Sequence, residues 1–191
     1  MSFIRIFRER RCVLCHEPFL PSDVGCGGII CEDCARDMTR PHFSCAGCGE
    51  PLASQGIYCI DCSDGRKWPW HVLKTYGLYQ GALRELIINA KYHADSPALH
   101  ACGQMLAEIA NELPKADAVI PVPSHGRRLL KRGFNQCAEM GKTLSRLAGI
   151  PLESDILLIT QERAVQHNLS QQERFRNLSG AFMANSKKKM Q

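Results

Sequence analysis

The chain has 191 residues, a formal net charge of +5 and 11 cysteines. Its length allows one medium-sized domain and a small module, and no stretch approaches the roughly 18 apolar residues of a membrane-spanning helix. Because the first ten residues also lack the apolar run of a signal peptide, we expect a cytoplasmic protein without a membrane span.

Eight of the cysteines form four Cys-x-x-Cys pairs in an imperfect tandem repeat over residues 12–62. Each unit contributes two pairs, and two thiolate pairs form the four-sulfur tetrahedral shell that structural zinc prefers. A duplicated unit is expected to fold around its own metal. We therefore predict two structural Zn²⁺ sites, the first held by Cys12, Cys15, Cys31 and Cys34 and the second by Cys45, Cys48, Cys59 and Cys62.

Disulfides or a haem would account for these cysteines less well than zinc does. Disulfides need an oxidising compartment, and nothing in the N-terminal residues points to one. The stretch from Cys12 to His16 fits a c-type haem attachment pattern, but the second unit has Gly49 in place of the histidine. A cross-braced arrangement that mixes the two units stays open, because spacing alone does not exclude it. Cys26 aligns with Ser54 and is expected to be a spare thiol.

Charge is distributed unevenly along the chain. Residues 1–70 carry a net charge of −1 and residues 71–191 a net charge of +6. Two zinc ions bound by eight thiolates would bring the first segment to about −5. A net-acidic pair of ribbons is a poor clamp for polyanions, so any contact with nucleic acid is expected on the second segment.

A polar stretch at residues 63–70 separates the repeat from the remainder and predicts domains at residues 1–66 and 71–191. In chain order, the second domain is predicted to contain a strand at 72–79, a helix through residues 83–90, a helix that begins at Ser96-Pro97, a buried strand at 118–122, a helix at about 135–147 and a strand at 155–160. Ser170-Gln-Gln-Glu173 is a capping box that begins a last helix. Alternating strands and helices predict an α/β fold with a mainly parallel sheet, preceded by a small double zinc ribbon.

The most informative segment of the second domain is Val119–Gln136. A predicted buried strand leads into a proline-flanked loop and then into four cations, Arg127, Arg128, Lys131 and Arg132. Ligands of open α/β sheets bind beyond the carboxyl ends of the strands, and arginine matches the oxygens of phosphate. We therefore expect an anion-binding loop that residues 133–136 cover. The alternative is an ordinary solvated helix face.

These motifs resemble the ComF/GntX family, in which a cysteine-rich zinc module precedes a type I phosphoribosyltransferase-like domain. The resemblance rests on Pro121-Val122-Pro123, on Arg132-Gly133-Phe134-Asn135-Gln136, on Ala90-Lys91-Tyr92 and on Gly180-Ala181-Phe182. It implies binding of phosphoribosyl pyrophosphate (PRPP). The substrate contacts it implies are Lys91, His125, Arg128, Arg132, Gly133, Asn135 and Gln136.

The family pattern also includes two adjacent acidic residues and a Thr-Thr-Gly loop that hold PRPP, and this sequence contains neither motif. We therefore expect a C-terminally incomplete domain, inactive as a catalyst, in which Mg²⁺ and PRPP would bind only if the site were complete. The resemblance implies either a phosphoribosyltransferase-like protein of DNA uptake or DNA utilisation, or a non-catalytic zinc-ribbon adaptor. The adaptor would dock a helicase or another DNA-processing protein, and single-stranded DNA is a further expected partner.

Overall fold

The computed structural model describes residues 10–20, 28–65, 68–92, 96–161 and 170–186. They belong to two compact units, Met1–Pro114 and Lys115–Gln191. The predicted spare thiol, Cys26, lies outside the described residues. Within the described ranges, no helix combines the length and the apolar character needed to cross a bilayer. The unit boundary lies well beyond residues 66–71, and the predicted division of domains there stays a prediction.

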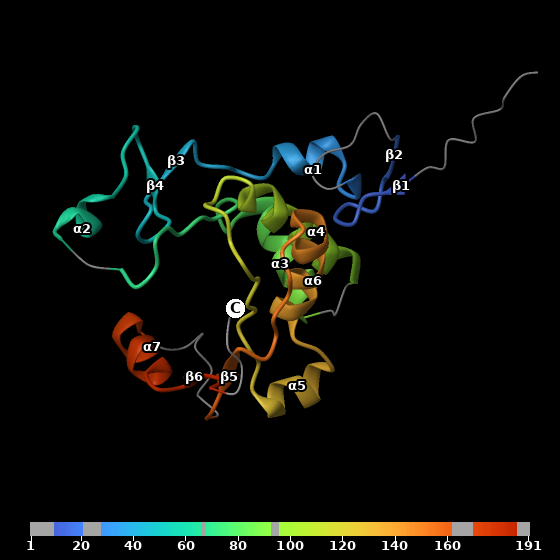
Figure 1. The fold of residues 1–191 in the computed structure, drawn as a ribbon. Coiled ribbons are helices and arrows are strands. Elements are labelled where there is room, and N and C mark those ends of the chain that lie inside the picture. The colour runs from blue at the N-terminus through green and yellow to red at the C-terminus, as the bar shows by residue number, and fades with distance from the viewer. Residues whose placement is uncertain (1–9, 21–27, 66–67, 93–95, 162–169, 187–191) are drawn as a thin grey trace, which may run out of the picture. The chain divides into compact units, whose positions relative to one another are not determined.

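The first unit begins with two copies of one small motif (Figure 1). In the first copy, β1 (Arg10–Arg11) pairs antiparallel with β2 (Pro18–Phe19), and α1 (Glu32–Arg36) follows. In the second, β3 (Phe43–Ser44) pairs antiparallel with β4 (Pro51–Leu52), and α2 (Ile60–Ser63) follows. We call residues 10–36 the first ribbon and residues 43–65 the second ribbon. The repeat seen in the sequence is therefore a repeat of structure.

Each ribbon makes a tight turn at the residue that follows its second cysteine. His16 has a φ of +61° and Gly49 a φ of +77°. The N–H of His16 donates to the carbonyl of Cys12 at 2.9 Å, and the N–H of Gly49 donates to the carbonyl of Cys45 at 2.8 Å. Histidine is enriched among the non-glycine residues that adopt this left-handed conformation. The turn therefore accounts for the pairing of His16 with Gly49 without any role for His16 in binding a haem.

The remainder of the first unit is a pair of packed helices, α3 (Gly81–Tyr92) and α4 (Ser96–Ala110), which lie side by side in Figure 1. Leu86 of α3 is 0% exposed and Met105 of α4 is 2% exposed. Full burial of such a side chain stabilises a fold by about 1.5–3 kcal/mol, so the packed faces of α3 and α4 contribute strongly to the core of this unit. Both predicted helices are confirmed, including the start of α4 at Ser96-Pro97.

Polar contacts fasten the ribbons to this helix pair. Asp37, the residue after α1, accepts a hydrogen bond on Oδ2 from the N–H of Ala82 at 2.7 Å and so caps the first turn of α3. Arg40 Nη2 lies 2.7 Å from Glu108 Oε2 on α4. Because the groups of that ion pair are largely exposed, it contributes little energy. The cap is the more important contact, because it satisfies a backbone donor that the helix itself leaves unpaired.

The strand predicted at residues 72–79 was wrong, because this described segment forms no strand. Its backbone N–H groups donate instead to the second ribbon and to the segment between the two ribbons. The N–H of Leu73 donates to the carbonyl of Ala46 at 2.9 Å, and the N–H of Leu78 donates to the carbonyl of Thr39 at 3.0 Å. Backbone groups engaged in this way are not available to a sheet ladder, so the segment serves as a strap between ribbons and helices.

The second unit contains α5 (Gly126–Arg132), α6 (Gln136–Ala148), β5 (Leu157–Ile159), α7 (Gln171–Leu178) and β6 (Phe182–Ala184). The predicted helix at 135–147 is confirmed as α6, which ends at Gly149 with a φ of +68°. The predicted strand at 155–160 is the shorter β5, which pairs antiparallel with β6. The capping box is confirmed too, since Ser170 N donates to Glu173 Oε2 at 2.7 Å.

The predicted mainly parallel sheet is not found among the described residues. Their strands form three two-stranded antiparallel sheets, and their one parallel pairing is the isolated bridge between Val119 and Leu152. Pro121 and Pro123 follow this bridge and have no N–H to donate, so the predicted strand at 118–122 does not extend into a ladder. The mixture of helices and strands agrees with the expectation only at this coarse level. A phosphoribosyltransferase-like domain stays a proposal.

The turn at Gly49 generates a prediction about stability. A Cβ at this position would lie 2.6 Å from Leu73 Cδ2 and 3.0 Å from Thr75 Cγ2, whereas a Cβ at Gly65, with a similar φ of +76°, would meet nothing within 4 Å. We expect Gly65→Ala to lower the free energy of unfolding by about 1 kcal/mol, from backbone strain alone. Gly49→Ala should cost about 1–3 kcal/mol more, because the strap must also move. Denaturant unfolding at fixed free zinc measures both, and equal losses would contradict the packing described here.

Candidate metal centres

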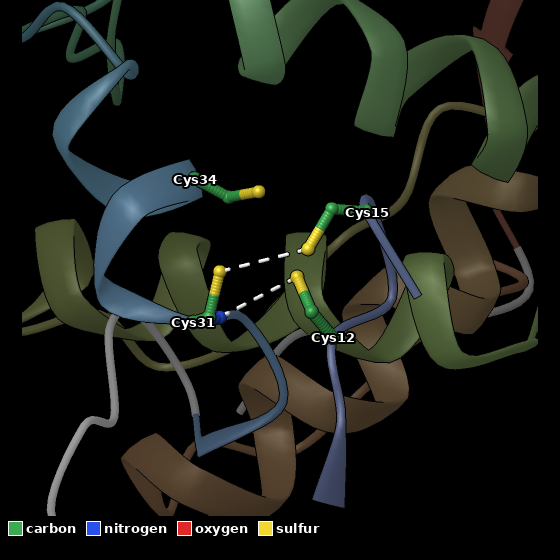
Figure 2. Close-up of side chains that lie close together, drawn as sticks. All are labelled: Cys12, Cys15, Cys31 and Cys34. Carbon is green, nitrogen blue, oxygen red and sulfur yellow. Dashed lines mark hydrogen bonds between the residues drawn. The ribbon is translucent and has the colours of Figure 1, made fainter. Parts of the chain in front are cut away.

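The eight predicted metal ligands lie in two groups of four. In each group, the sulfur atoms all lie within 4.8 Å of one another. Cys15 Sγ and Cys31 Sγ are 3.8 Å apart, and Cys48 Sγ and Cys59 Sγ are 3.7 Å apart. Sulfurs around a tetrahedral zinc at about 2.3 Å would be separated by about 3.8 Å. The thiols of the first group point toward a common centre in Figure 2. Each group could therefore hold one zinc ion.

The grouping follows the ribbons. Cys12, Cys15, Cys31 and Cys34 form one group, and Cys45, Cys48, Cys59 and Cys62 form the other. Each ribbon supplies one pair from its β-hairpin and one pair from the start of its short helix. This is the sequential arrangement that the duplication predicts, and neither group draws a ligand from the other ribbon. A cross-braced pairing has no geometric support.

The electrostatics of each group favour a bound cation. Burial opposes ionisation of the Cys12 thiol, but N–H groups of Cys31, Cys15 and Leu14 approach its sulfur and lower its pKa to about 7. Burial also opposes ionisation of Cys45, where N–H groups of the second ribbon lower the pKa to about 6.

The last cysteine of each ribbon behaves in the opposite way. Burial and the neighbouring thiols raise the pKa of Cys34 and of Cys62 above the usual range. Each group therefore holds one thiol that ionises readily and one that ionises only beside a positive charge. Four thiolates this close together repel one another, and a divalent cation removes that repulsion.

The basic segment of the second unit is helical, because residues 126–132 form α5 directly after the proline-flanked loop. Leu129 and Leu130 of this helix are 41% and 88% exposed. The side chains of Arg127, Arg128 and Lys131 lie outside what the structure describes, so the anion-binding role of the segment stays a prediction. Gly133 has a φ of +80° and lies just after the helix ends.

Asn135 holds the loop before α5 to the start of α6. Its Oδ1 accepts hydrogen bonds from the N–H of Cys137 at 3.1 Å and from Ser124 Oγ at 3.2 Å, while its Nδ2 donates to the carbonyl of Val122 at 3.0 Å. Asn135 is thus the N-cap of α6. An asparagine directly before a helical pattern is an N-cap signal, so this role was readable in the sequence but was not predicted.

The other predicted substrate contacts lie in two places. His125 precedes α5, Arg132 is its last residue, and Gln136 is 9% exposed at the start of α6. Arg128 lies within α5, but its side chain is outside what the structure describes. Lys91 is exposed in the last turn of α3, in the first unit. The structure therefore gathers six of the seven residues in one segment, and their role in binding a substrate stays a prediction.

The paired shells generate a prediction about metal content. We expect the purified chain to bind two equivalents of zinc, measured by elemental analysis. Replacing Cys15 and Cys34 by serine should leave one equivalent, and so should replacing Cys48 and Cys59, because each ribbon holds its own ion. Cys137→Ser is the control, since Cys137 is exposed and lies in neither group. Loss of both ions from either double variant would show that the ribbons share ligands.

Comparisons with known proteins bear on the identity of the chain. No family model and no solved structure matches it. The DNA utilization protein YhgH of Salmonella typhi is 30% identical over 177 residues, which cover 90% of this chain and 76% of the relative. The same-named protein of Escherichia coli K12 is 31% identical over the same extent. Competence protein F of Haemophilus influenzae is 26% identical over 159 residues, 80% of this chain and 69% of the relative. With these relatives along nine tenths of its length, the chain belongs to the ComF/GntX family.

Proposed function

We propose that this chain is a zinc-ribbon adaptor in DNA utilisation or DNA uptake. The main support for this proposal is that each ribbon offers four sulfur ligands at the spacing of a tetrahedral zinc site. A zinc ion with four protein ligands has no open position for substrate or water and acts structurally. The metal in each ribbon then stabilises the fold of the ribbon and does not take part in a reaction. We infer that a protein partner binds the surface that this fold presents.

The biological setting of this proposal comes from the relatives. Two of them are named DNA utilization protein and one is named competence protein. In DNA utilisation or DNA uptake, we expect the partner to be a helicase or another DNA-processing protein. The hydrogen bond from Ala82 to Asp37 supports an adaptor role as well, because it attaches the segment that links the two ribbons to the start of α3.

A second candidate function is anion binding at the segment from Val122 to Gln136. This candidate is favoured because the side chain of Asn135 forms hydrogen bonds to Val122 and Ser124 and so fixes the loop. The loop directly precedes α5, which contains four cationic residues. A fixed loop is a better phosphate site than a mobile one, since less ordering is needed when the ligand binds. PRPP with Mg²⁺ is the ligand if the segment acts as in a phosphoribosyltransferase. Single-stranded DNA is the ligand if the cations contact a polyanion.

The adaptor proposal predicts a specific pattern in host cells that lack the gene. We expect deletion to impair growth on DNA as the carbon source or uptake of labelled DNA, and the intact chain to restore it. Cys48→Ser with Cys59→Ser should fail to restore it, because the second ribbon cannot hold its metal. Arg128→Ala should restore it, because the adaptor does not need the basic segment. Rescue by the cysteine variant, or a deletion with no effect on either readout, would contradict the proposal.

The second candidate makes a separate prediction in solution. If the loop binds PRPP, isothermal titration with PRPP and Mg²⁺ should give saturable heat that Arg128→Ala removes. Arg84→Ala is the matched control, because Arg84 is an exposed arginine of α3 outside the basic segment. If the ligand is single-stranded DNA, affinity should fall steeply with salt, with a log–log slope of about −0.7 for each phosphate contact. The absence of heat with either ligand would eliminate this candidate.

A further inference from the structure

The second ribbon exposes apolar side chains around its ligand Cys59. Ile57, Tyr58 and Ile60 are 70%, 48% and 86% exposed. We call these three residues the tip surface. Single exposed apolar residues are common, but three large ones within four positions of a small metal module are not. The other side of the same ribbon is covered, since Gly49 is in close contact with Leu73 and Thr75 of the strap.

The first ribbon provides an internal comparison at matching positions. Ile30 corresponds to Tyr58 and is 0% exposed, and Glu32 corresponds to Ile60 and is an exposed carboxylate. On the hairpin, Arg10 of the first ribbon corresponds to Phe43 of the second, which is 40% exposed. The contrast holds at two positions, where the first ribbon exposes Glu32 and Arg10 and the second exposes Ile60 and Phe43. Ile57 corresponds to Ile29, which is apolar in the first ribbon as well.

The comparison separates Ile60 of the tip surface from the requirements of metal binding. Both ribbons form the same four-sulfur group, and the first does so with Glu32 in the position of Ile60. Ile60 is therefore not needed to build the shell. An exposed apolar side chain that the fold does not require favours association, and such surfaces mark contact sites for other proteins.

The charge around the tip surface narrows the class of partner. The second ribbon carries three carboxylates, Glu50, Asp61 and Asp64, and no lysine or arginine. A zinc ion with four thiolates adds a net charge of about −2. The ribbon would repel DNA and anionic lipid surfaces, and it would attract a cationic protein segment. An exposed apolar surface on a ribbon whose own charged side chains are all carboxylates fits a partner that combines apolar and cationic side chains.

We propose that the tip surface docks a cationic amphipathic helix of a partner protein. Such a helix presents apolar side chains at positions i, i+3 and i+4, with lysine or arginine on either side. The apolar side chains would contact Ile57, Tyr58 and Ile60, and the cations would face the carboxylates and the zinc–thiolate group. This inference rests on the proposed adaptor function and deepens it, because it names the surface and the chemistry of the partner.

The test uses the zinc-loaded full chain and three labelled helical peptides of about 18 residues, which is five helical turns. One peptide has leucine on one face and lysine on the other, the second replaces lysine by glutamate, and the third replaces leucine by serine. We expect saturable binding of the leucine–lysine peptide, measured by fluorescence anisotropy. The other two peptides should bind at least about tenfold more weakly, because each lacks half of the recognition pattern.

Substitutions in the chain test whether the leucine–lysine peptide binds at the tip surface. Ile57→Ser with Ile60→Ser should weaken the leucine–lysine peptide by about tenfold or more, since the central apolar contacts are lost. Leu147→Ser is the matched control, because Leu147 is an apolar residue of α6 with 54% exposure outside the ribbons. Two bound zinc equivalents in every variant establish that the ribbons are folded. Binding that survives the double substitution, or equal binding of the serine–lysine peptide, would overturn the proposal.

Two further measurements distinguish this docking proposal from self-association and from the proposed adaptor function. If sedimentation shows a dimer that the double substitution dissociates, a second copy covers the tip surface and the proposal is wrong. The growth assay with the gene deletion tests the adaptor function independently of peptide binding. If the deletion has no effect while peptide binding depends on Ile57 and Ile60, the adaptor role in DNA utilisation is refuted. The proposal that the tip surface docks a cationic helix would then still hold.

Discussion

Four sulfur atoms held within 4.8 Å of one another are the constraint on which each ribbon depends. A ribbon contributes two strands of two residues each and a helix of at most five, which bury little apolar surface. Modules of this size usually need a metal or disulfides to fold. In zinc-finger peptides, the free energy of zinc binding is about 10–16 kcal/mol and is coupled directly to folding. The turns at His16 and Gly49, the hairpins and the short helices all serve to bring two cysteine pairs to one point.

The parts of the structure that could be predicted from sequence are those with a local cause. The cysteine spacing led to both sulfur groups, and the helical periodicity and caps led to α3, α4, α6 and α7, because each signal lies within the element that it forms. The strand at 72–79 failed because its backbone partners are distant in sequence, with Ala46 in the second ribbon and Thr39 between the two ribbons. The helix α5 was only an alternative in the sequence because its apolar residues, Leu129 and Leu130, face solvent, so no buried stripe marks it. The tip surface could not be predicted either, since apolar residues beside cysteines suggest burial until the fold shows otherwise.

The two units of this member of the ComF/GntX family differ in the charged residues that they carry. The second ribbon combines exposed apolar residues with carboxylates alone, while the sequence of α5 contains four cationic residues together with the exposed Leu129 and Leu130. A surface of the first kind suits a protein partner, and a surface of the second kind suits phosphate groups. In the proposed adaptor, zinc has a structural role and keeps the surface of the second ribbon in shape.

The cap that Asp37 provides has a consequence for how the first unit unfolds. Asp37 lies three residues after the ligand Cys34, and its carboxylate satisfies the first turn of α3. Zinc loss from the first ribbon would free that carboxylate and leave the N–H of Ala82 without its acceptor. We therefore expect zinc binding to the first ribbon to favour formation of α3 through this one side chain. The first ribbon and the helix pair should then unfold together, with the metal stabilising a helix that it never touches.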